Sequence, residues 1–449
     1  MDRDKTKIYE GMKVTILGMA KSGQAAAKML SGLGAKVFCS DSGCPKDIET
    51  LGFPYETGAH SDKVYDAQMM VVSPGIPHDN PVVMRAKMKG IKVRGELDLA
   101  AELLSCPYAA ITGTSGKSTT TGLIAHMLNK AGKKSKAVGN IGDPLSNYVV
   151  ESRPEDVMSI EVSSFQCELM ESFYPGVAVF TNLAEDHLNR HGTMGEYARL
   201  KEKMFVHMKS DDLVVLNKDD EWSGALSAKT PSKSLYFSMN NAKADAYFDG
   251  KSIFVSGKKI ASMKDYKLFG WFNAMNLMAA GLAVSRFGLD PATAIQSSTD
   301  FVPLHNRLEF VGQWGGVKFI NDSKATKPSA TTLALNALEG PFILILGGSE
   351  KGSDFSVLPA DMGNVRLAVI HGQTAQRIEE ALINGNFKKF VSVKDQAEAI
   401  EVAIKEAKPG DTVLLSPACA SFDQFGGYEE RGEVFTRQVR EQAPKALGS

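Results

Sequence analysis

The stretch YAAITGTSGKSTTTGLIAHMLNKAG, residues 108–132, constrains the possible fold of this chain more than any other feature. Its first five residues have the composition of a buried strand. Apolar side chains then recur on one face of a helical pattern, at Leu123, Ile124, Met127 and Leu128. A glycine-rich turn between a strand and a helix directs backbone N–H groups and the positive helix end at an anion. With Lys117 and Ser118 at the end of that turn, the stretch predicts a phosphate-binding loop.

The loop departs from the general pattern G-x-x-x-x-G-K-[ST], because Ile111 occupies the position of the first glycine. Gly113 supplies the turn instead. Since the flanking strand and helix are both predicted, phosphate binding is favoured over a chance Gly-Lys-Ser turn. The candidate phosphate contacts are Gly113, Thr114, Ser115, Gly116, Lys117, Ser118 and Thr119.

Acidic and imidazole side chains follow two further predicted strands of the same unit. Glu161 closes VMSIEV, and Asp186 and His187 follow GVAVFTN within TNLAEDHLNRHG. Ligands of open α/β sheets bind at the carboxyl ends of the parallel strands. Carboxylates at that edge, beside a phosphate loop, suit a divalent metal ion that bridges nucleotide phosphates.

Units of strand, turn and helix recur along the whole chain. The first contains the strands KVTIL and KVFCSD with the helix QAAAKML between them, followed by MMVVSPGI and GIKVRGELDL. The second contains the phosphate loop, the strand LVVLN, short alternating runs over residues 230–268 that predict small antiparallel strands, and the helix NAMNLMAAGLAVSRFG. The third contains VKFIND, FILILGG, LAVIHG, KFVSV and TVLLSP. Such alternation predicts an α/β fold with three parallel-sheet units in series.

The first unit carries a second candidate phosphate turn, GMAKSG. It matches G-x-G-x-x-G except that Ala20 replaces the second glycine, and Asp41 follows about 20 residues later. A pyrophosphate at a helix N-terminus explains such a turn, as in a dinucleotide-binding fold. No hydride-transfer site is evident in the sequence.

The bulk composition argues against several classes of protein. Lys and Arg number 51 against 52 Asp and Glu, so no basic surface for nucleic acid is indicated. No run of about 18 apolar residues predicts a membrane span, and the N-terminal MDRDKTKIYEGM lacks the apolar core of a signal peptide. Five scattered cysteines do not suggest a disulfide framework. We therefore expect a cytoplasmic protein without nucleic-acid or membrane partners.

Six motifs spread over the three units resemble those of one enzyme family, the Mur ligases. They are GTSGKST, EVSSFQ, NLAEDHLNRHG, YARLKEKMF, NDSKATKPSAT and SPACASFDQF. The last two resemble the branch of the family that adds D-glutamate. The resemblance implies a Rossmann-like UDP-binding domain over residues 1–97, a P-loop ATPase domain over 98–302 and a Rossmann-like amino-acid-binding domain over 303–449. We also expect a monomer.

The resemblance further implies a reaction. ATP would phosphorylate the terminal carboxylate of UDP-N-acetylmuramoyl-L-alanine, and the amine of D-glutamate would then displace phosphate, with Mg²⁺ as the metal. Phosphoryl transfer of this kind depends on positioning and charge neutralisation. The residues implied to be catalytic are Lys117, Glu161, His187 and Lys201, and the implied metal ligands are Ser118, Glu161, His187 and Lys201 as a carbamate.

Binding roles follow from the same resemblance. Beside the loop, the implied nucleotide contacts are Asn273, Asn276, Arg307 and Asp322. The implied contacts of the UDP-linked substrate are Lys21, Ser22, Asp41, Ser42, Gly75, Asn140, Ser163 and Gln166. The implied D-glutamate pocket consists of Lys324, Thr326, Lys351, Ser421, Phe422 and Tyr428. Ammonium and hydroxyl donors in that pocket suit two carboxylates.

Three residues depart from the family pattern. Ser115 stands where Asn is most frequent in the loop, which contacts through the backbone tolerate. Asn306 separates His305 from Arg307 where many relatives run His-Arg directly, so Arg307 is the safer assignment of the two. Lys327 replaces an Asn beside the glutamate pocket, and either altered affinity or an added anion contact would follow.

Other functions compete with this interpretation. The N-terminal UDP unit argues against a folylpolyglutamate-synthase-like ligase, and the motifs NDSKAT and SPACASFDQF argue against another Mur ligase. An NTP-hydrolysing switch or motor would turn over ATP without any amino acid. A nicotinamide-dependent oxidoreductase would change the absorbance of its cofactor.

Overall fold

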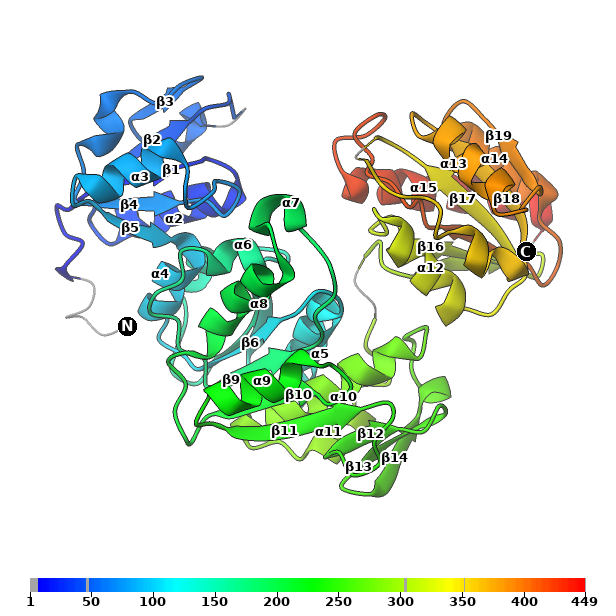
Figure 1. Cartoon of the computed structure of the whole chain (residues 1–449), viewed down its shortest axis with the longest axis horizontal. Helices are drawn as coiled ribbons and strands as arrows, with labels where there is room; N and C mark the ends of the chain where they lie inside the picture. Colours follow the sequence, from blue (N-terminus) through cyan, green and yellow to red (C-terminus); the bar gives the residue numbers. More distant parts are fainter. Residues whose placement is uncertain (1–6, 46–47, 303–304, 351, 449) are drawn as a thin grey trace. The chain divides into compact units, whose positions relative to one another are not determined.

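The computed structural model describes residues 7–45, 48–302, 305–350 and 352–448, and Figure 1 shows the whole chain. The chain forms two compact units, Met1–Tyr266 with Asn273–Phe301 and Lys267–Phe272 with Val302–Ser449. The first unit contains two sheets and the second unit contains one. The sheets are mostly parallel, which confirms the predicted α/β class. The domain boundaries at residues 97 and 302 stay predictions.

The first sheet has the order β3-β2-β1-β4-β5, and all its strands run parallel. Strand β4 is buried and apolar throughout, and β1 is buried after Lys13, as expected for a sheet covered on both faces. Helix α2 packs on β1, β2 and β4, so the turn between β1 and α2 lies at the carboxyl edge of the sheet. The bounds are β1 Lys13–Leu17, α2 Lys21–Gly32, β2 Lys36–Asp41, β3 Tyr55–Thr57, β4 Met69–Val72, α3 Pro81–Met88 and β5 Lys92–Gly95.

The segment GIKVRGELDL divides differently from the prediction. Strand β5 ends at Gly95, and helix α4, Glu96–Leu103, begins at the next residue. Seven of the eight residues of α4 are buried, polar ones included. A helix buried on all sides shows no amphipathic period, which is why the sequence did not reveal it.

The second sheet has nine strands in the order β14-β13-β12-β11-β10-β9-β6-β8-β7. Helix α5 packs on β6, β7 and β8, which brings its N-terminus to the carboxyl edge of the sheet. The strands are β6 Tyr108–Thr112, β7 Ser135–Gly139, β8 Val157–Glu161, β9 Val177–Phe180, β10 Leu213–Asn217, β11 Lys233–Ser238, β12 Ala246–Phe248, β13 Ser252–Val255 and β14 Lys258–Ser262. The helices are α5 Lys117–Lys130, α6 Ser164–Cys167, α7 Leu188–His191, α8 Met194–Glu202, α9 Trp222–Lys229, α10 Phe272–Val284 and α11 Pro291–Gln296.

The prediction of small antiparallel strands over residues 230–268 is only partly right. Strands β12, β13 and β14 pair antiparallel, as predicted. Strand β11, however, pairs parallel with β10, and β12 pairs parallel with β11. These two strands therefore extend the parallel sheet, because the long-range partner β10 decides their direction.

The third sheet lies in the second unit and has the order β15-β16-β20-β17-β18-β19. Only its edge strand β15 is antiparallel to its neighbour. Helices α14 and α15 pack against one another, and a second apolar core lies beneath α12 and α13. The bounds are β15 Glu309–Trp314, β16 Val317–Asn321, α12 Pro328–Ala337, β17 Phe342–Gly347, β18 Val365–His371, α13 Ala375–Asn384, β19 Phe390–Ser392, α14 Gln396–Glu406, β20 Thr412–Leu415 and α15 Tyr428–Leu447.

Short 3₁₀ turns connect several of these elements, at η1 Glu49–Leu51, η2 Asp62–Tyr65, η3 Leu145–Tyr148, η4 Lys203–Phe205, η5 Met263–Asp265, η6 Ser285–Phe287 and η7 Pro359–Asn364. In the described part of the chain, every helix is too short or too polar to span a lipid bilayer.

Candidate active site

The predicted phosphate loop joins β6 to α5, and both of its glycines have backbone conformations that side chains disfavour. Gly113 has φ +141° and Gly116 has φ +84°. A Cβ atom at Gly113 would lie 2.0 Å from the Thr181 hydroxyl, and one at Gly116 would lie 2.5 Å from the Asn276 carboxamide oxygen. Both positions therefore require glycine, for conformation and for space.

The end of β9 holds the loop in place. The Asn182 side chain accepts from the Ser115 N–H at 2.9 Å and donates to the Ser115 carbonyl at 3.1 Å. The Thr181 hydroxyl donates to the same carbonyl at 2.6 Å. The Asn182 carbonyl accepts from the Thr114 N–H at 2.9 Å, and the Thr114 and Tyr197 hydroxyls lie 3.2 Å apart. These contacts reach Ser115 through its backbone, which fits the predicted tolerance of a serine there.

Lys117 begins α5, and its ammonium group lies over the loop. It donates to the carbonyl oxygens of Gly113, at 3.0 Å, and of Thr114, at 2.7 Å. Ser118 and Thr119 follow in the first turn of α5, and each is 5% exposed. A cation, a hydroxyl group and a helix N-terminus therefore lie within one short segment, the arrangement that favours phosphate.

Helix α10 brings the two predicted asparagines to the same loop. Asn276 accepts a hydrogen bond from the Thr120 hydroxyl at 3.2 Å and donates to Asn273 at 2.8 Å. Both asparagines are nearly buried. The carboxamide of Asn276 also packs on Gly116, so these residues support the loop from the side of α10.

Glu161 ends β8 beside the loop and is 3% exposed. Its Oε1 atom accepts from the Asn140 side chain at 2.8 Å. Its Oε2 atom is buried, and no described residue donates a hydrogen bond to it. A buried acceptor without a donor is costly, so this oxygen is suited to a cation or a water molecule.

Lys201, on α8, is the most unusual group of the site because it is only 1% exposed. Its ammonium donates to the Gly113 carbonyl at 2.9 Å and lies 4.6 Å from the centre of the Tyr197 ring. Burial, and then the charge of Lys117, lower the pKa of Lys201 from 10.5 to about 7. A large fraction of this lysine is therefore neutral at neutral pH, which is what nucleophilic attack on carbon dioxide requires.

His187 precedes α7 and adopts a left-handed conformation with φ +54°. Its Nε2 atom lies 3.4 Å from an Asp186 carboxylate oxygen. Its ring lies 4.8 Å from that of Phe165, which in turn lies 5.4 Å from His191. His191 stacks on Tyr197 at 5.5 Å. A row of rings therefore connects His187 with the surroundings of the buried lysine.

The predicted metal ligands do not form a complete coordination shell by themselves. Among the residues that the structure describes, no three Asp, Glu, His or Cys side chains gather as a metal site. The charge of Glu161 nevertheless reaches Lys201, and one oxygen of Glu161 lacks a donor among the described residues. Mg²⁺ is commonly bound through one or two carboxylates and substrate phosphates, so this donor set fits Mg²⁺.

The second predicted turn, between β1 and α2, is shaped by Asp41. The two oxygens of that carboxylate accept from the backbone N–H groups of Met19, at 2.6 Å, and Gly43, at 2.7 Å. Lys21 is exposed and Ser22 is half-buried at the start of α2, and Ser42 is exposed nearby. Asp41 therefore organises the turn, and whether it also contacts substrate stays a prediction.

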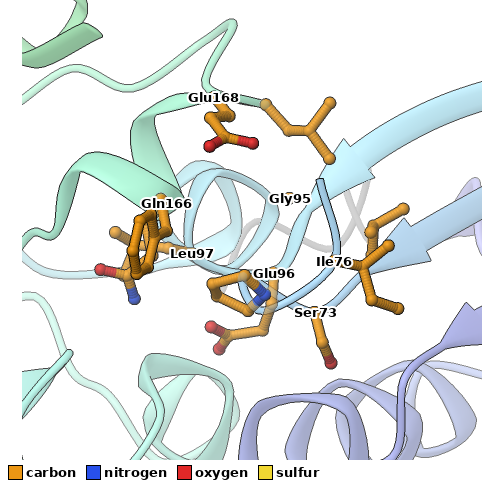
Figure 2. A pocket seen from close by; sticks show the side chains of 11 residues that line it. Ser73, Ile76, Gly95, Glu96, Leu97, Gln166 and Glu168 are labelled. Carbon is orange, nitrogen blue, oxygen red and sulfur yellow. The ribbon is translucent and has the colours of Figure 1, made fainter. Parts of the chain in front are cut away.

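A small pocket lies between the turn that follows β4 and the α6 region, as Figure 2 shows. Gln166 lines it, and Ser163 and Gln166 form a reciprocal capping box at the start of α6. Glu96 also lines the pocket and accepts from the Ser146 hydroxyl at 2.6 Å. The Gly75 carbonyl accepts from Arg190 at 3.2 Å. Of the predicted contacts, Gln166 lines this pocket, Gly75 belongs to the turn that borders it, and Ser163 caps α6.

The second unit contains the residues predicted to bind D-glutamate, and Arg307 and Asp322 predicted to bind nucleotide. Burial raises the pKa of Asp322 to about 7, although the Ser416 hydroxyl and the Arg307 charge partly oppose this. The ammonium of Lys324 lies 5.4 Å from the centre of the Tyr428 ring. Thr326 is half-buried, Ser421 is buried and Phe422 is 63% exposed. Lys351 lies outside the described residues.

The extra residue Asn306 has a structural role. It adopts φ +64°, which asparagine tolerates better than most residues, and it is 5% exposed. Its carboxamide oxygen accepts from the Asn321 side chain at 2.9 Å. The neighbouring His305 side chain is 93% exposed and lies 3.0 Å from Glu309. These contacts explain the departure as local packing and give His305 no part in a buried site.

Sequence reasoning missed several residues that shape the site. Thr181, Asn182 and Tyr197 contact the loop directly, and Arg190 contacts the turn at Gly75. All four lie within or next to motifs that were recognised, GVAVFTN, NLAEDHLNRHG and YARLKEKMF. The available signals were the positions of Thr181 and Asn182 after the end of β9 and of Tyr197 on the buried face of α8.

The fold and the loop define a nucleotide-binding type of α/β protein with a phosphate loop. The chain matches the family models described as Mur ligase MurD-like, N-terminal domain over residues 12–95, Mur ligase middle domain over 111–284, and Mur ligase, glutamate ligase domain over 306–419. A relative from Acidobacterium capsulatum is 38% identical over 442 residues, 95% of each chain. One from Ligilactobacillus salivarius is 36% identical over 442 residues, 96% of each chain. Both relatives are named UDP-N-acetylmuramoylalanine–D-glutamate ligase. The chain belongs to the Mur ligase family.

Solved structures share the fold at lower identity. The UDP-N-acetylmuramate-alanine ligase MurC from Thermotoga maritima has a TM-score of 0.66 at 20% identity, with 96% of this chain and 99% of that chain covered. The MurF ligase from Thermotoga maritima in complex with ADP has a TM-score of 0.59 at 16% identity, with 98% and 96% covered. These likenesses agree with the mostly parallel sheets described above.

Proposed function

We propose that this protein joins D-glutamate to UDP-N-acetylmuramoyl-L-alanine with the hydrolysis of ATP to ADP and phosphate, a step of peptidoglycan precursor synthesis. The observation that carries the proposal is the phosphate loop, with Lys117 over it and the buried groups Glu161 and Lys201 beside it. Near-complete coverage at 35–38% identity by relatives of that name supports the choice of substrates.

The reaction requires the protein mainly to position charged groups. A carboxylate oxygen of the L-alanyl group attacks the γ-phosphorus, and ADP leaves. The amine of D-glutamate loses a proton and attacks the acyl carbon, and phosphate leaves with the bonding electrons. The backbone of residues 113–119 cradles the phosphates, and Lys117 offsets the charge of the β- and γ-phosphates.

Mg²⁺ would neutralise further phosphate charge, held by Ser118, Glu161, His187 and a carbamate on Lys201. In that modification the neutral Lys201 nitrogen bonds to the carbon of carbon dioxide and releases one proton. The lowered pKa of Lys201 supports it, because only the neutral amine has a free electron pair. The carbamate turns a cation into an anionic oxygen ligand.

The remaining predicted residues take the binding roles. We propose that residues 1–97, 98–302 and 303–449 serve as the UDP-binding, ATP-binding and amino-acid-binding domains. The UDP-linked substrate would contact Lys21, Ser22, Asp41, Ser42, Gly75, Asn140, Ser163 and Gln166. D-Glutamate would contact Lys324, Thr326, Lys351, Ser421, Phe422 and Tyr428, and the nucleotide would also contact Asn273, Asn276, Arg307 and Asp322. A monomer in the cytoplasm is the expected form.

An omission assay tests this function. Phosphate release is measured with ATP and Mg²⁺, leaving out in turn the UDP-linked substrate and D-glutamate. We expect release only when both are present, together with formation of the amide product. Sustained release without D-glutamate would refute the ligase and favour a nucleotide-hydrolysing switch.

A further inference from the structure

One arginine connects helix α7 with the turn that follows β4. The Nε and Nη2 atoms of Arg190 donate to the two carboxylate oxygens of Glu168, each at 2.8 Å. Its Nη1 atom donates to the Gly75 carbonyl at 3.2 Å. Its guanidinium carbon lies 5.2 Å from the centre of the Phe165 ring. All three guanidinium nitrogen atoms therefore donate hydrogen bonds, which fixes the orientation of the group.

Glu168 also contacts the far end of the same turn, at His78. Its Oε2 atom lies 3.2 Å from both the backbone nitrogen and the Nδ1 atom of His78. The Glu168 side chain is only 3% exposed, and the Arg190 side chain is 19% exposed. Burial alone would raise the pKa of Glu168, but the hydrogen bonds from Arg190 and His78 hold it below its ordinary value. The carboxylate is therefore charged and bridges two parts of the chain.

This bridge borders the pocket of Figure 2 through Glu168. Ser73, Pro74 and Ile76 line the pocket from the turn, and Phe165 and the labelled Glu168 line it from the α6 region. The turn contains Gly75, a residue type with little conformational preference of its own. A hydrogen bond to the Gly75 carbonyl removes much of that freedom.

Arg190 is also linked to His187. The two residues are three positions apart, and the Arg190 N–H donates to the His187 carbonyl at 2.9 Å. Phe165 contacts both side chains, since the His187 ring lies 4.8 Å from it. Movement of Arg190 would therefore disturb the turn and the segment that carries His187 together.

We propose that Arg190 and Glu168 are positioning residues for the UDP-linked substrate: they hold the turn of residues 73–78 in its binding conformation and fasten it to helix α7. This inference rests on the proposed function and adds residues to it that touch no substrate themselves. The turn loses conformational freedom before substrate arrives, so less entropy is lost on binding.

The test compares Arg190→Gln, Arg190→Lys and Glu168→Gln with the wild type. Isothermal titration gives the Kd of UDP-N-acetylmuramoyl-L-alanine, and steady-state kinetics gives the KM of each substrate. We expect Arg190→Gln to weaken binding of the UDP-linked substrate at least tenfold, with the KM values of ATP and D-glutamate changed less than twofold. Arg190→Lys keeps the positive charge but not the two-pronged hydrogen bonding, so its Kd should lie between those of the wild type and Arg190→Gln. The double variant Arg190→Gln/Glu168→Gln should bind only slightly more weakly than Arg190→Gln alone.

Arg199→Gln is the matched control. Arg199 forms the same two-pronged contact with Glu196, at 2.7 Å for both bonds, but on the exposed surface of α8. Its loss should leave the Kd within twofold of the wild-type value. If Arg190→Gln does not fold, Arg190→Lys and Glu168→Gln decide by the same criteria.

Two results would overturn the inference. Variants that bind the UDP-linked substrate as tightly as the wild type would show that the turn does not depend on the contact between Arg190 and Glu168. Equal losses for all three substrates would show general damage instead of positioning. If the wild type itself did not bind the UDP-linked substrate, the proposed function would be overturned and the inference with it. This outcome is distinct because it is seen in the wild type and not only in the variants.

Discussion

Replacing Lys201 with Met tests how strongly this buried lysine prefers to be neutral. Burial and the nearby Lys117 charge lower the pKa of Lys201 from 10.5 to about 7 in the folded protein. In the unfolded chain, water surrounds the side chain and its pKa returns to the ordinary value. The folded and unfolded states therefore differ by almost one bound proton between these two pH values.

The sign and size of the effect follow from this difference. Below pH 7 the lysine is charged in both states, and the cost of burying the charge is present in full. Between pH 7 and 10.5 the unfolded state binds more protons, so the free energy of unfolding rises with pH, by about 1.4 kcal/mol per unit at most. From pH 7.5 to pH 9.0, the wild type should gain about 2 kcal/mol relative to Lys201→Met.

Urea unfolding of both proteins in buffer free of carbon dioxide measures this difference, and other titrating groups cancel in the comparison. Replacing Lys258, whose side chain is exposed, with Met is the control for the Lys-to-Met change itself. A constant difference for Lys201→Met would refute the lowered pKa. Labelled ¹³C-bicarbonate should then produce a carbamate signal in the wild type that Lys201→Met lacks.

Two further predictions follow from the structure. Lys201→Ala should lower ligase activity roughly 100-fold, because an anionic ligand is lost, and short carboxylic acids should restore part of the rate; full activity without them would show that Lys201 has no such role. Gly432→Ala should destabilise the second unit by about 2 kcal/mol in urea unfolding, since its Cβ would lie 1.7 Å from the Asn306 carboxamide oxygen. An unchanged midpoint would mean that Asn306 moves aside freely.

Many strands of the three sheets could be predicted closely because they are continuous apolar runs, whereas β3, β7 and β15 were not predicted. VKFIND and FILILGG, for example, correspond to β16 and β17 within one residue. The direction of β11 could not be predicted, since it depends on pairing with β10 and not on its own residues. Helix α4 was hidden because its polar residues are buried too: Asp98 accepts from the Arg94 guanidinium at 2.8 Å.

The phosphate loop was predictable from local sequence, but the environment of Lys201 was not. On α8, Lys201 lies four residues after Tyr197, so both are on the buried face of the helix. A lysine at such spacing is ordinarily solvated, and only the family resemblance singled it out. The contact between Arg190 and Glu168 joins residues 22 positions apart, so no short sequence motif predicts it.

Two lysines donate to one carbonyl oxygen, and this links nucleotide binding to the charge of Lys201. The Gly113 carbonyl accepts from Lys117 at 3.0 Å and from Lys201 at 2.9 Å, and their repulsion favours the neutral form of Lys201. A phosphate oxygen is charged and is therefore a better acceptor for Lys117 than a carbonyl. Its arrival adds negative charge and draws Lys117 away, and both changes raise the pKa of Lys201. Nucleotide should therefore slow carbamate formation. Protein incubated with bicarbonate before ATP should then reach its full rate sooner than protein given ATP first. Equal lag times for the two orders of addition would show that nucleotide binding does not affect carbamate formation.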